Sequence, residues 1–113
     1  MHVLRQCGNG REAVKAIREL APDLVFLDVQ MPGVDGFGVV EAIGPLAMPA
    51  VIFVTAYDAN AVKAFDAEAV DFLLKPIDDD RFARALARAR RRLEERTQQA
   101  MGARVAAVLA QLG

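Results

Sequence analysis

Residues 24–36 read LVFLDVQMPGVDG, a stretch in which four apolar residues end at Asp28 and lead into Pro32 and Gly33. A short apolar run without alternation is typical of a strand that is buried on both faces of a parallel sheet. Proline and glycine shortly after it indicate a turn. The stretch therefore predicts a buried strand over Leu24–Leu27, with the carboxylate of Asp28 at its carboxyl end.

Further strands and helices are predicted to alternate along the chain. Apolar runs at Ala50–Val54 and Val70–Leu74 end at Thr55 and at Lys75-Pro76, and a shorter, more polar fourth candidate lies at His2–Gln6. Apolar residues at three- and four-residue spacing predict helices between the strands and after the last one. These helices are expected at Arg11–Leu20, Asp35–Ile43, Asn60–Ala67 and Asp78 to about Arg96. The alternation predicts an α/β fold, with a parallel sheet of about four strands and helices on both faces.

The C-terminal stretch differs in composition from the rest of the chain. Residues 97–113 are rich in Ala and Gln, and they carry Val105, Val108 and Leu112 at helical spacing. We interpret this stretch as a further helix or a linker, with a break near Gly102. A chain of 113 residues has room for one core. The expected organisation is therefore one domain over residues 1–96, followed by the helix or linker of residues 97–113.

The composition is that of a globular protein, with 54% hydrophobic and 26% charged residues. The formal net charge of −1 indicates neither nucleic acid nor an anionic membrane as an obligatory partner. Cys7 is the only cysteine, which excludes an intrachain disulfide. No apolar run approaches the roughly 18–20 residues that span a bilayer, and the N-terminus does not resemble a secretory signal. We therefore expect a cytoplasmic protein.

Three polar residues, Asp28, Thr55 and Lys75, follow successive predicted strands. Ligands of open parallel sheets bind beyond the carboxyl ends of the strands, so these side chains are expected to meet at one edge. A carboxylate there can act as the nucleophile in phosphoryl transfer, while a hydroxyl and an ammonium group bind the phosphoryl oxygens. Any one of them alone is equally well explained as a polar strand end that faces water. All three together favour phosphoryl chemistry.

These motifs resemble those of response-regulator receiver domains, the phosphorelay modules of two-component signalling, which have a flavodoxin-like fold. Residues 27–36, LDVQMPGVDG, look like the phosphoacceptor loop. Residues 54–57, VTAY, resemble the threonine switch segment of the family, and residues 71–76, DFLLKP, resemble its Lys-Pro segment. The order and spacing match over roughly residues 1–95. The run from Ala56 to Pro76 is most similar to receivers that precede LytTR-type DNA-binding domains.

The resemblance implies a role for each matching residue. Asp28 would be the phosphorylated aspartate, and Thr55 and Lys75 would bind the phosphoryl group. Phe72 would be the aromatic residue that changes rotamer on activation. Asp28 and the backbone carbonyl of Gln30 would contribute to a Mg²⁺ site. The family's Lys-Pro bond, here Lys75-Pro76, is typically cis, and the partner would be a histidine kinase or another phosphohistidine donor.

One departure from the family pattern concerns the metal. Receivers open with a strand that ends in two adjacent acidic residues, whereas this chain begins at what looks like the second strand, and no acidic residue precedes Glu12. The expected domain is therefore truncated, without the first strand, the first helix and the acidic pair. Mg²⁺ prefers oxygen ligands that include carboxylates, so its binding here is doubtful. Phosphotransfer to Asp28 would then be slow or absent.

The missing strand leaves two arrangements of the sheet open. The first strand of this chain could pair directly with Leu24–Asp28, which gives four strands in sequence order, or a partner molecule could supply the missing contacts. Right-handed crossovers place the first three helices on one face and only the Asp78–Arg96 helix on the other. Half of that second face would then be bare and apolar, which predicts a homodimer.

The functional hypotheses come from different classes. The leading one is a non-enzymatic receiver that acts through protein–protein contacts. The alternatives are a phosphorylation-independent pseudo-receiver or dimerisation module, and a fragment of a LytTR-type transcriptional regulator, in which DNA binding would belong to the longer protein. A phosphatase of the haloacid dehalogenase type would need a second aspartate at position 30, which is Gln30. The Arg-rich stretch of residues 84–96 is better explained as a solvated helix face than as a nucleic-acid surface.

Overall fold

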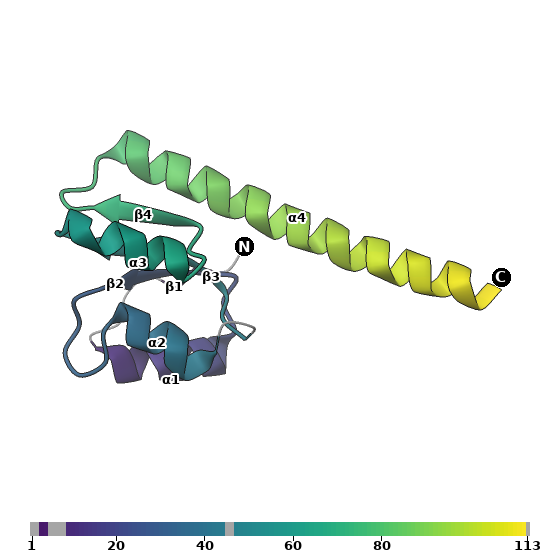
Figure 1. Ribbon diagram of the computed structural model, residues 1–113, viewed down its shortest axis with the longest axis horizontal. Helices are drawn as coiled ribbons and strands as arrows, with labels where there is room; N and C mark the ends of the chain where they lie inside the picture. The colour runs from purple at the N-terminus through teal and green to yellow at the C-terminus, as the bar shows by residue number, and fades with distance from the viewer. Residues whose placement is uncertain (1–2, 5–8, 45–46, 113) are drawn as a thin grey trace.

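The computed structural model describes the backbone of residues 3–4, 9–44 and 47–112, and the side chains of these residues up to residue 98. Strands and helices alternate along the chain as the sequence predicts (Figure 1). The elements are β1 Val3–Leu4, α1 Gly10–Leu20, β2 Leu24–Asp28, α2 Gly36–Ile43, β3 Ala50–Thr55, the 3-10 helix η1 Asp58–Asn60, α3 Ala61–Asp66, β4 Asp71–Leu74 and α4 Asp79–Leu112. Of the strand expected at His2–Gln6, only Val3 and Leu4 lie within the described residues.

The four strands form one parallel sheet in the order β1-β2-β3-β4. Val3 of β1 pairs with Leu24 of β2, and Leu24 in turn pairs with Ala50 of β3. This is the first of the two arrangements left open by the sequence, in which the chain's first strand pairs directly with β2. The strands therefore lie in sequence order across the sheet, and each connection joins two neighbouring strands.

Helices cover both faces of the sheet, as predicted. Successive residues of a strand point to opposite faces, so Val25, Leu27 and Phe53 belong to a core that they share with α1, α2 and α3. Leu24, Ile52 and Leu73 point the other way and pack against α4. Both clusters are built from side chains that are almost completely buried. The first three helices therefore share one face and α4 covers the other.

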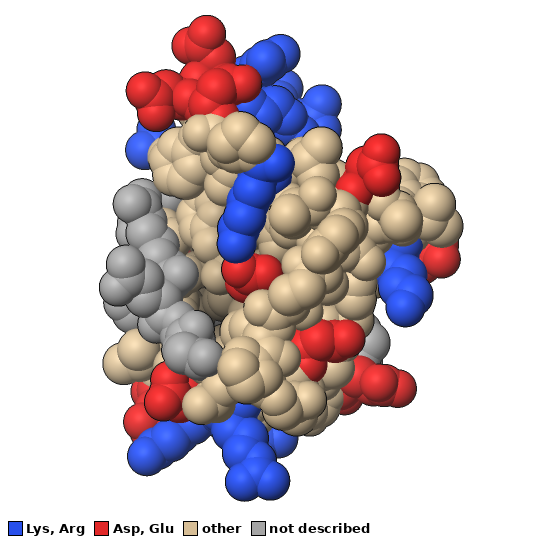
Figure 2. Space-filling view, turned by 90° about the vertical axis from the view of Figure 1, so that its left-hand side faces the viewer, with Lys and Arg blue, Asp and Glu red and all other residues tan. Residues whose placement is uncertain are grey.

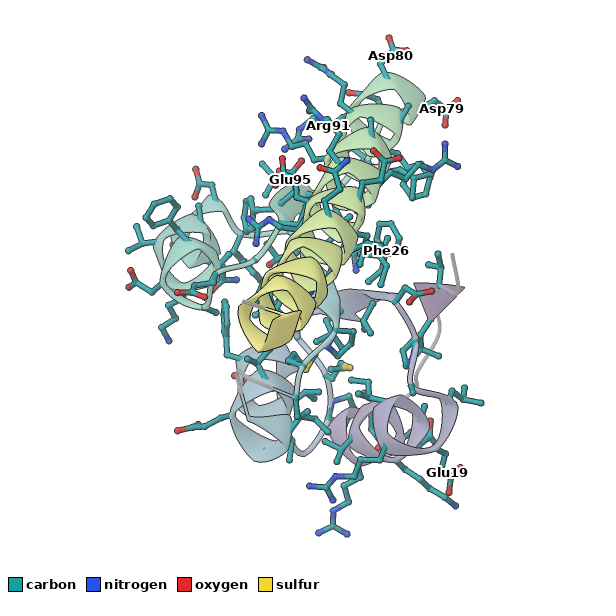
Figure 3. The ribbon with its side chains drawn as sticks, turned by 90° about the vertical axis from the view of Figure 1, so that its right-hand side faces the viewer. Glu19, Phe26, Asp79, Asp80, Arg91 and Glu95 are labelled. Carbon is teal, nitrogen blue, oxygen red and sulfur yellow. The ribbon has the colours of Figure 1, made fainter. Side chains whose placement is uncertain are left out.

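The face under α4 is better covered than expected. Phe26 of β2 stacks on Phe82 of α4 with ring centroids 5.3 Å apart, so α4 extends over β2 as well as β3 and β4. Figure 3 shows Phe26 directed toward the helix. The large hydrophobic side chains that are exposed among the described residues lie elsewhere: Leu20, Tyr57, Val62, Phe65, Leu74 and Ile77. The expectation of a bare, apolar half-face is therefore wrong for the part of the molecule that the structure describes.

Helix α4 begins as predicted but ends much later. The carboxylate of Asp78 accepts a hydrogen bond from the Arg81 amide (2.7 Å), which caps the first turn. The helix then runs for 34 residues and extends far beyond the sheet (Figure 1). The break expected near Gly102 is wrong, because a single glycine costs a helix only about 1 kcal/mol. No helix within the described residues has the length and apolar composition needed to cross a membrane.

Candidate functional site

The carboxyl edge of the sheet brings together the three polar residues singled out in the sequence. Asp28 ends β2, Thr55 ends β3 and Lys75 follows β4 directly. The Lys75 amide donates to the Thr55 carbonyl (2.7 Å), which keeps the ends of β3 and β4 side by side. Figure 2 looks onto this edge, where a basic side chain reaches across neutral surface to an acidic one. The predicted convergence of these residues is confirmed, while their roles remain predictions.

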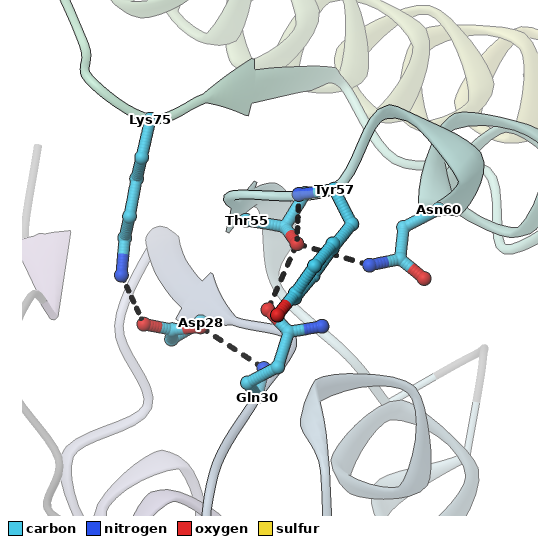
Figure 4. Close-up of polar contacts among 6 residues, drawn as sticks. All are labelled: Asp28, Gln30, Thr55, Tyr57, Asn60 and Lys75. Carbon is cyan, nitrogen blue, oxygen red and sulfur yellow. Dashed lines mark hydrogen bonds and ion pairs between the residues drawn. The ribbon is translucent and has the colours of Figure 1, made fainter.

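The carboxylate of Asp28 is held on both of its oxygens. Lys75 Nζ lies 2.6 Å from Oδ2, and the backbone amide of Gln30 donates to Oδ1 (3.0 Å) (Figure 4). The Asp28 and Lys75 side chains are 35% and 47% exposed, so a phosphoryl donor can reach the carboxylate from solvent. The ammonium group is already placed to neutralise charge that builds up on this carboxylate.

Thr55 is completely buried, and its hydroxyl makes three hydrogen bonds. It donates to Gln30 Oε1 (2.8 Å) and accepts from the Tyr57 amide (3.1 Å) and from Asn60 Nδ2 (2.9 Å) (Figure 4). Gln30 therefore links Asp28 to Thr55, because its backbone amide contacts Asp28 and its side-chain carbonyl contacts Thr55. The sequence identified Gln30 only through its backbone carbonyl. It gave no signal for Asn60, whose place depends on the turn after β3.

The loop after β2 is fixed at both ends. Gly36 donates to the Val29 carbonyl (3.1 Å), which folds the start of α2 back against the strand end. Asp35 caps α2 by accepting from the Gly38 amide (2.8 Å). Gly33 adopts a φ of 79°, in the left-handed region that favours glycine. The turn chemistry expected from residues 32–36 therefore determines where Asp28 and Gln30 lie.

Two further predictions concern the segment around β4. The Lys75-Pro76 peptide bond is cis, as the resemblance implies. Phe72, the predicted switch aromatic, is partly buried and packs against the core on the face covered by α1–α3. Its carbonyl accepts a hydrogen bond from Arg81 (2.9 Å), so the position of this residue is coupled to α4. A change of its rotamer remains a prediction.

A second ion pair, away from the carboxyl edge of the sheet, joins β4 to α4. Arg81 donates to both carboxylate oxygens of Asp71, at 2.9 and 2.7 Å, and Arg88 lies 3.9 Å away. Burial by itself raises the pKa of Asp71, but the hydrogen bonds from Arg81 and from the Phe72 amide, together with both arginine charges, outweigh it and leave the pKa below its usual value. The sequence alone did not reveal this pair, since its members lie on separate elements.

The residues described at this edge do not make a complete magnesium site. Asp28 and the backbone carbonyl of Gln30 are the two ligands expected from the sequence. Mg²⁺ favours octahedral oxygen coordination with one or two carboxylates and several further ligands. Within residues 3–4, 9–44 and 47–98, no group of three His, Cys, Asp or Glu side chains is placed to hold a metal ion.

Comparison with known proteins agrees with this geometry. Residues 1–87 match the family described as response regulator receiver domain. An uncharacterized response regulatory protein of Yersinia pestis is 45% identical over 93 residues, which cover 82% of this chain and 39% of the relative. The transcriptional regulatory protein BtsR of Escherichia coli is 41% identical over 99 residues, covering 88% of this chain and 40% of BtsR. The chain thus spans about two fifths of the length of these curated relatives.

Solved structures show the same fold. The response regulatory domain of protein mrkE from Klebsiella pneumoniae superposes with a TM-score of 0.69 at 30% identity, covering 78% of this chain and 73% of that one. The signal receiver domain of a Luxo repressor protein from Vibrio parahaemolyticus gives a TM-score of 0.72 at 30% identity, covering 81% of this chain and 73% of that one. Both belong to the class that the motifs at the carboxyl edge resemble.

Proposed function

We propose that this chain, which belongs to the response regulator receiver domain family, accepts a phosphoryl group on Asp28 and passes the signal on through protein–protein contacts. The observation that carries the proposal is the Asp28 carboxylate at the end of β2, with Lys75 Nζ 2.6 Å from one of its oxygens. Histidine kinases are the usual partners of this family, so a phosphohistidine is the natural donor.

The groups at this edge support such a transfer. One Asp28 oxygen attacks the phosphorus atom of the phosphohistidine, a P–O bond forms as the P–N bond breaks, and the imidazole leaves with the electrons of the broken bond. Lys75 balances the negative charge that the phosphoryl group brings to this edge. The hydroxyl of Thr55 is the second group that binds the phosphoryl oxygens.

The central experiment is incubation with acetyl phosphate, with and without Mg²⁺, followed by intact mass measurement. We expect one added phosphoryl group on the wild-type chain, formed slowly and at a similar rate with and without Mg²⁺, and none on Asp28→Asn. The matched control is Asp58→Asn, an exposed aspartate of η1 that should still be modified. An unmodified wild-type chain would overturn the proposal and favour the alternative, a pseudo-receiver that works without phosphorylation.

We further propose that this chain binds Mg²⁺ weakly. The support is that no three His, Cys, Asp or Glu side chains of the described residues are grouped to hold a metal ion, which would need several oxygen ligands. Tyr57 is the only tyrosine and the chain has no tryptophan, so ultraviolet fluorescence reports on the turn after Thr55. A titration with Mg²⁺ should leave this fluorescence unchanged at millimolar concentrations. A saturable change at micromolar Mg²⁺ would contradict weak binding.

A homodimer is also part of the proposal. Its support is the exposed apolar surface on α3, where Val62 is 70% exposed and Phe65 84% exposed. Side chains of this size in neighbouring turns of one helix favour burial against another protein. Light scattering should give twice the mass of one chain at tens of micromolar, and Phe65→Ser should shift it toward one chain. The exposed Lys15→Ser on α1 is the control, and a monomeric wild-type chain would contradict the dimer.

We place this receiver in a longer cytoplasmic transcriptional regulator of LytTR type. The support is the likeness to BtsR and the share of the relatives that the chain covers. Residues 1–96 would be the receiver, and residues 97–113 the helix or linker toward the output domain. An electrophoretic mobility assay tests whether DNA binding belongs to the output domain. The longer regulator should shift its DNA, and this chain alone should not.

A further inference from the structure

We propose that the side chain of Gln30 is a positioning element that holds the Thr55 hydroxyl away from Asp28 until Asp28 is phosphorylated. This inference deepens the proposed function and rests on it. In the unphosphorylated protein Gln30 Oε1 accepts the Thr55 hydroxyl hydrogen at 2.8 Å (Figure 4). Gln30 thereby competes with the phosphoryl group for the same donor.

The competition follows from the hydrogen-bonding capacity of a hydroxyl group. A threonine hydroxyl has one hydrogen to donate and two lone pairs that accept. At Thr55 both lone pairs are occupied, because the Tyr57 amide and Asn60 Nδ2 are donors. The single hydrogen is left for Gln30 Oε1. The hydroxyl is therefore fully used in the unphosphorylated state, and its orientation is fixed from three sides.

A phosphoryl group on Asp28 changes which acceptor is favoured. Its oxygens are strong, negatively charged acceptors, and they can bind Thr55 only through that same hydrogen. Because Thr55 is completely buried, its hydroxyl needs a protein or phosphoryl acceptor in either state. Activation is then an exchange of acceptors, from the carboxamide of Gln30 to the phosphoryl group. Phosphorylation of Asp28 shifts the balance toward the phosphoryl group, and loss of the Gln30 acceptor shifts it in the same direction.

Gln30 is well placed to respond to Asp28. Its backbone amide donates to Asp28 Oδ1 (3.0 Å). The residue that contacts the phosphoacceptor therefore also carries the competing acceptor. The side chain of Gln30 is exposed, whereas that of Thr55 is not. Replacing Gln30 therefore removes an acceptor without opening a cavity in the core. This separates the proposed role from a purely structural one.

The first test needs no phosphorylation. The chain has two threonines, Thr55 and Thr97, so the methyl signal of Thr55 can be assigned with Thr97→Ser. Three-bond couplings to that methyl carbon report the χ1 rotamer of Thr55. We expect one rotamer in the wild-type chain and in Gln30→Glu, which keeps a side-chain acceptor, and averaged couplings in Gln30→Leu, which has none. A single, unchanged rotamer in Gln30→Leu would overturn the proposal.

The second test measures the exchange. Titration with acetyl phosphate, read by intact mass and by the Thr55 couplings, gives the phosphorylated fraction and the rotamer together. Loss of one competing neutral hydrogen bond should lower the acetyl phosphate needed for half conversion by about three- to tenfold in Gln30→Leu. Met31→Leu, a volume-conserving change at the next residue, should leave it unchanged. Equal midpoints for Gln30→Leu and the wild type would overturn the proposal.

The two readouts separate the inference from the function on which it rests. If no mass is added to the wild-type chain while Gln30→Leu releases the rotamer, phosphorylation of Asp28 is refuted and the hold on Thr55 stands. If mass is added but the rotamer and the midpoint are the same in both chains, phosphorylation stands and the role of Gln30 is refuted.

Discussion

Gly36 lies so close to the backbone of Asp28 that a side chain would not fit between them. A Cβ atom built on Gly36 would be 2.8 Å from the Asp28 carbonyl oxygen and 3.2 Å from the Cα atom of Val29. Both contacts are with backbone, which cannot rotate away. The start of α2 can fold back against the end of β2 only because residue 36 is glycine. The place of Asp28 thus depends on a residue that carries no chemistry of its own.

The first prediction concerns this contact. Gly36→Ala should lower the free energy of unfolding by about 1–3 kcal/mol, as overpacking does, and should also slow modification of Asp28 by displacing its loop. Urea unfolding followed by circular dichroism measures the first effect and acetyl phosphate labelling the second. Glu41→Ala is the control, because this exposed change on the same helix touches no packed backbone and should alter stability by less than about 0.5 kcal/mol. Equal stability of Gly36→Ala and the wild type would contradict the prediction.

The second prediction concerns the bidentate pair between β4 and α4. Arg81→Ala leaves the buried carboxylate of Asp71 without its two closest hydrogen bonds. Removing one partner of a buried pair costs about 3–5 kcal/mol, and we expect about 2 kcal/mol here because the Arg81 side chain is 36% exposed. Arg88→Ala is the matched control on the same helix. It removes a contact of 3.9 Å from a side chain that is 59% exposed, and should cost less than about 1 kcal/mol.

Chemical denaturation measures both arginine variants. Equal losses in Arg81→Ala and Arg88→Ala would mean that the charge of the helix matters rather than the bidentate geometry. Arg81→Lys refines the comparison, because an ammonium group keeps the charge but cannot bind both oxygens in the same fork. The free energy of unfolding of Arg81→Lys should lie between those of the wild type and Arg81→Ala.

The third prediction is the pH dependence that this pair creates. The pKa of Asp71 is lower in the folded chain than its ordinary value of 3.8. Stability from its ionised form is therefore fully present above about pH 4, and is lost as the pH falls through the lower, folded-state pKa. The stability difference between the wild type and Asp71→Asn should shrink below about pH 4. A difference that stays constant from about pH 6 to about pH 2.5 would contradict it.

Much of the fold and of the site could be predicted because the deciding signals are local. Unalternated apolar runs identified β2, β3 and β4, and the end of each run located Asp28, Thr55 and Lys75. Their convergence then follows from the rule that parallel strands share one carboxyl edge. The N-cap of α4 at Asp78 could also be predicted, since it depends on one side chain and the backbone amide three positions later.

The rest depends on geometry that no local pattern contains. The hydrogen bonds of Thr55 with Gln30 and Asn60 require the turn after β3 to face the loop after β2. Thr55 and Gln30 are 25 residues apart in the sequence. The cover over β2 was not predicted because the stacking of Phe82 on Phe26 joins residues of separate elements, α4 and β2. The length of α4 differs from the prediction because a lone glycine such as Gly102 lowers helix stability too little to end a long helix.

The last prediction tests how α4 is held against the sheet. Phe26 and Phe82 stack with an interplanar angle of 17°, and both side chains are partly buried. Aromatic pairs of this kind contribute about 0.5–1.5 kcal/mol beyond the area they bury. A double-mutant cycle with Phe26→Leu and Phe82→Leu should therefore give a coupling energy in that range. The control cycle pairs Phe82→Leu with Phe37→Leu, since Phe37 packs on Phe53 in the core on the opposite face of the sheet. That cycle should be additive to within about 0.5 kcal/mol. If both cycles are additive, α4 is held by its apolar stripe as a whole, and the stacked pair gives no specific anchoring over β2.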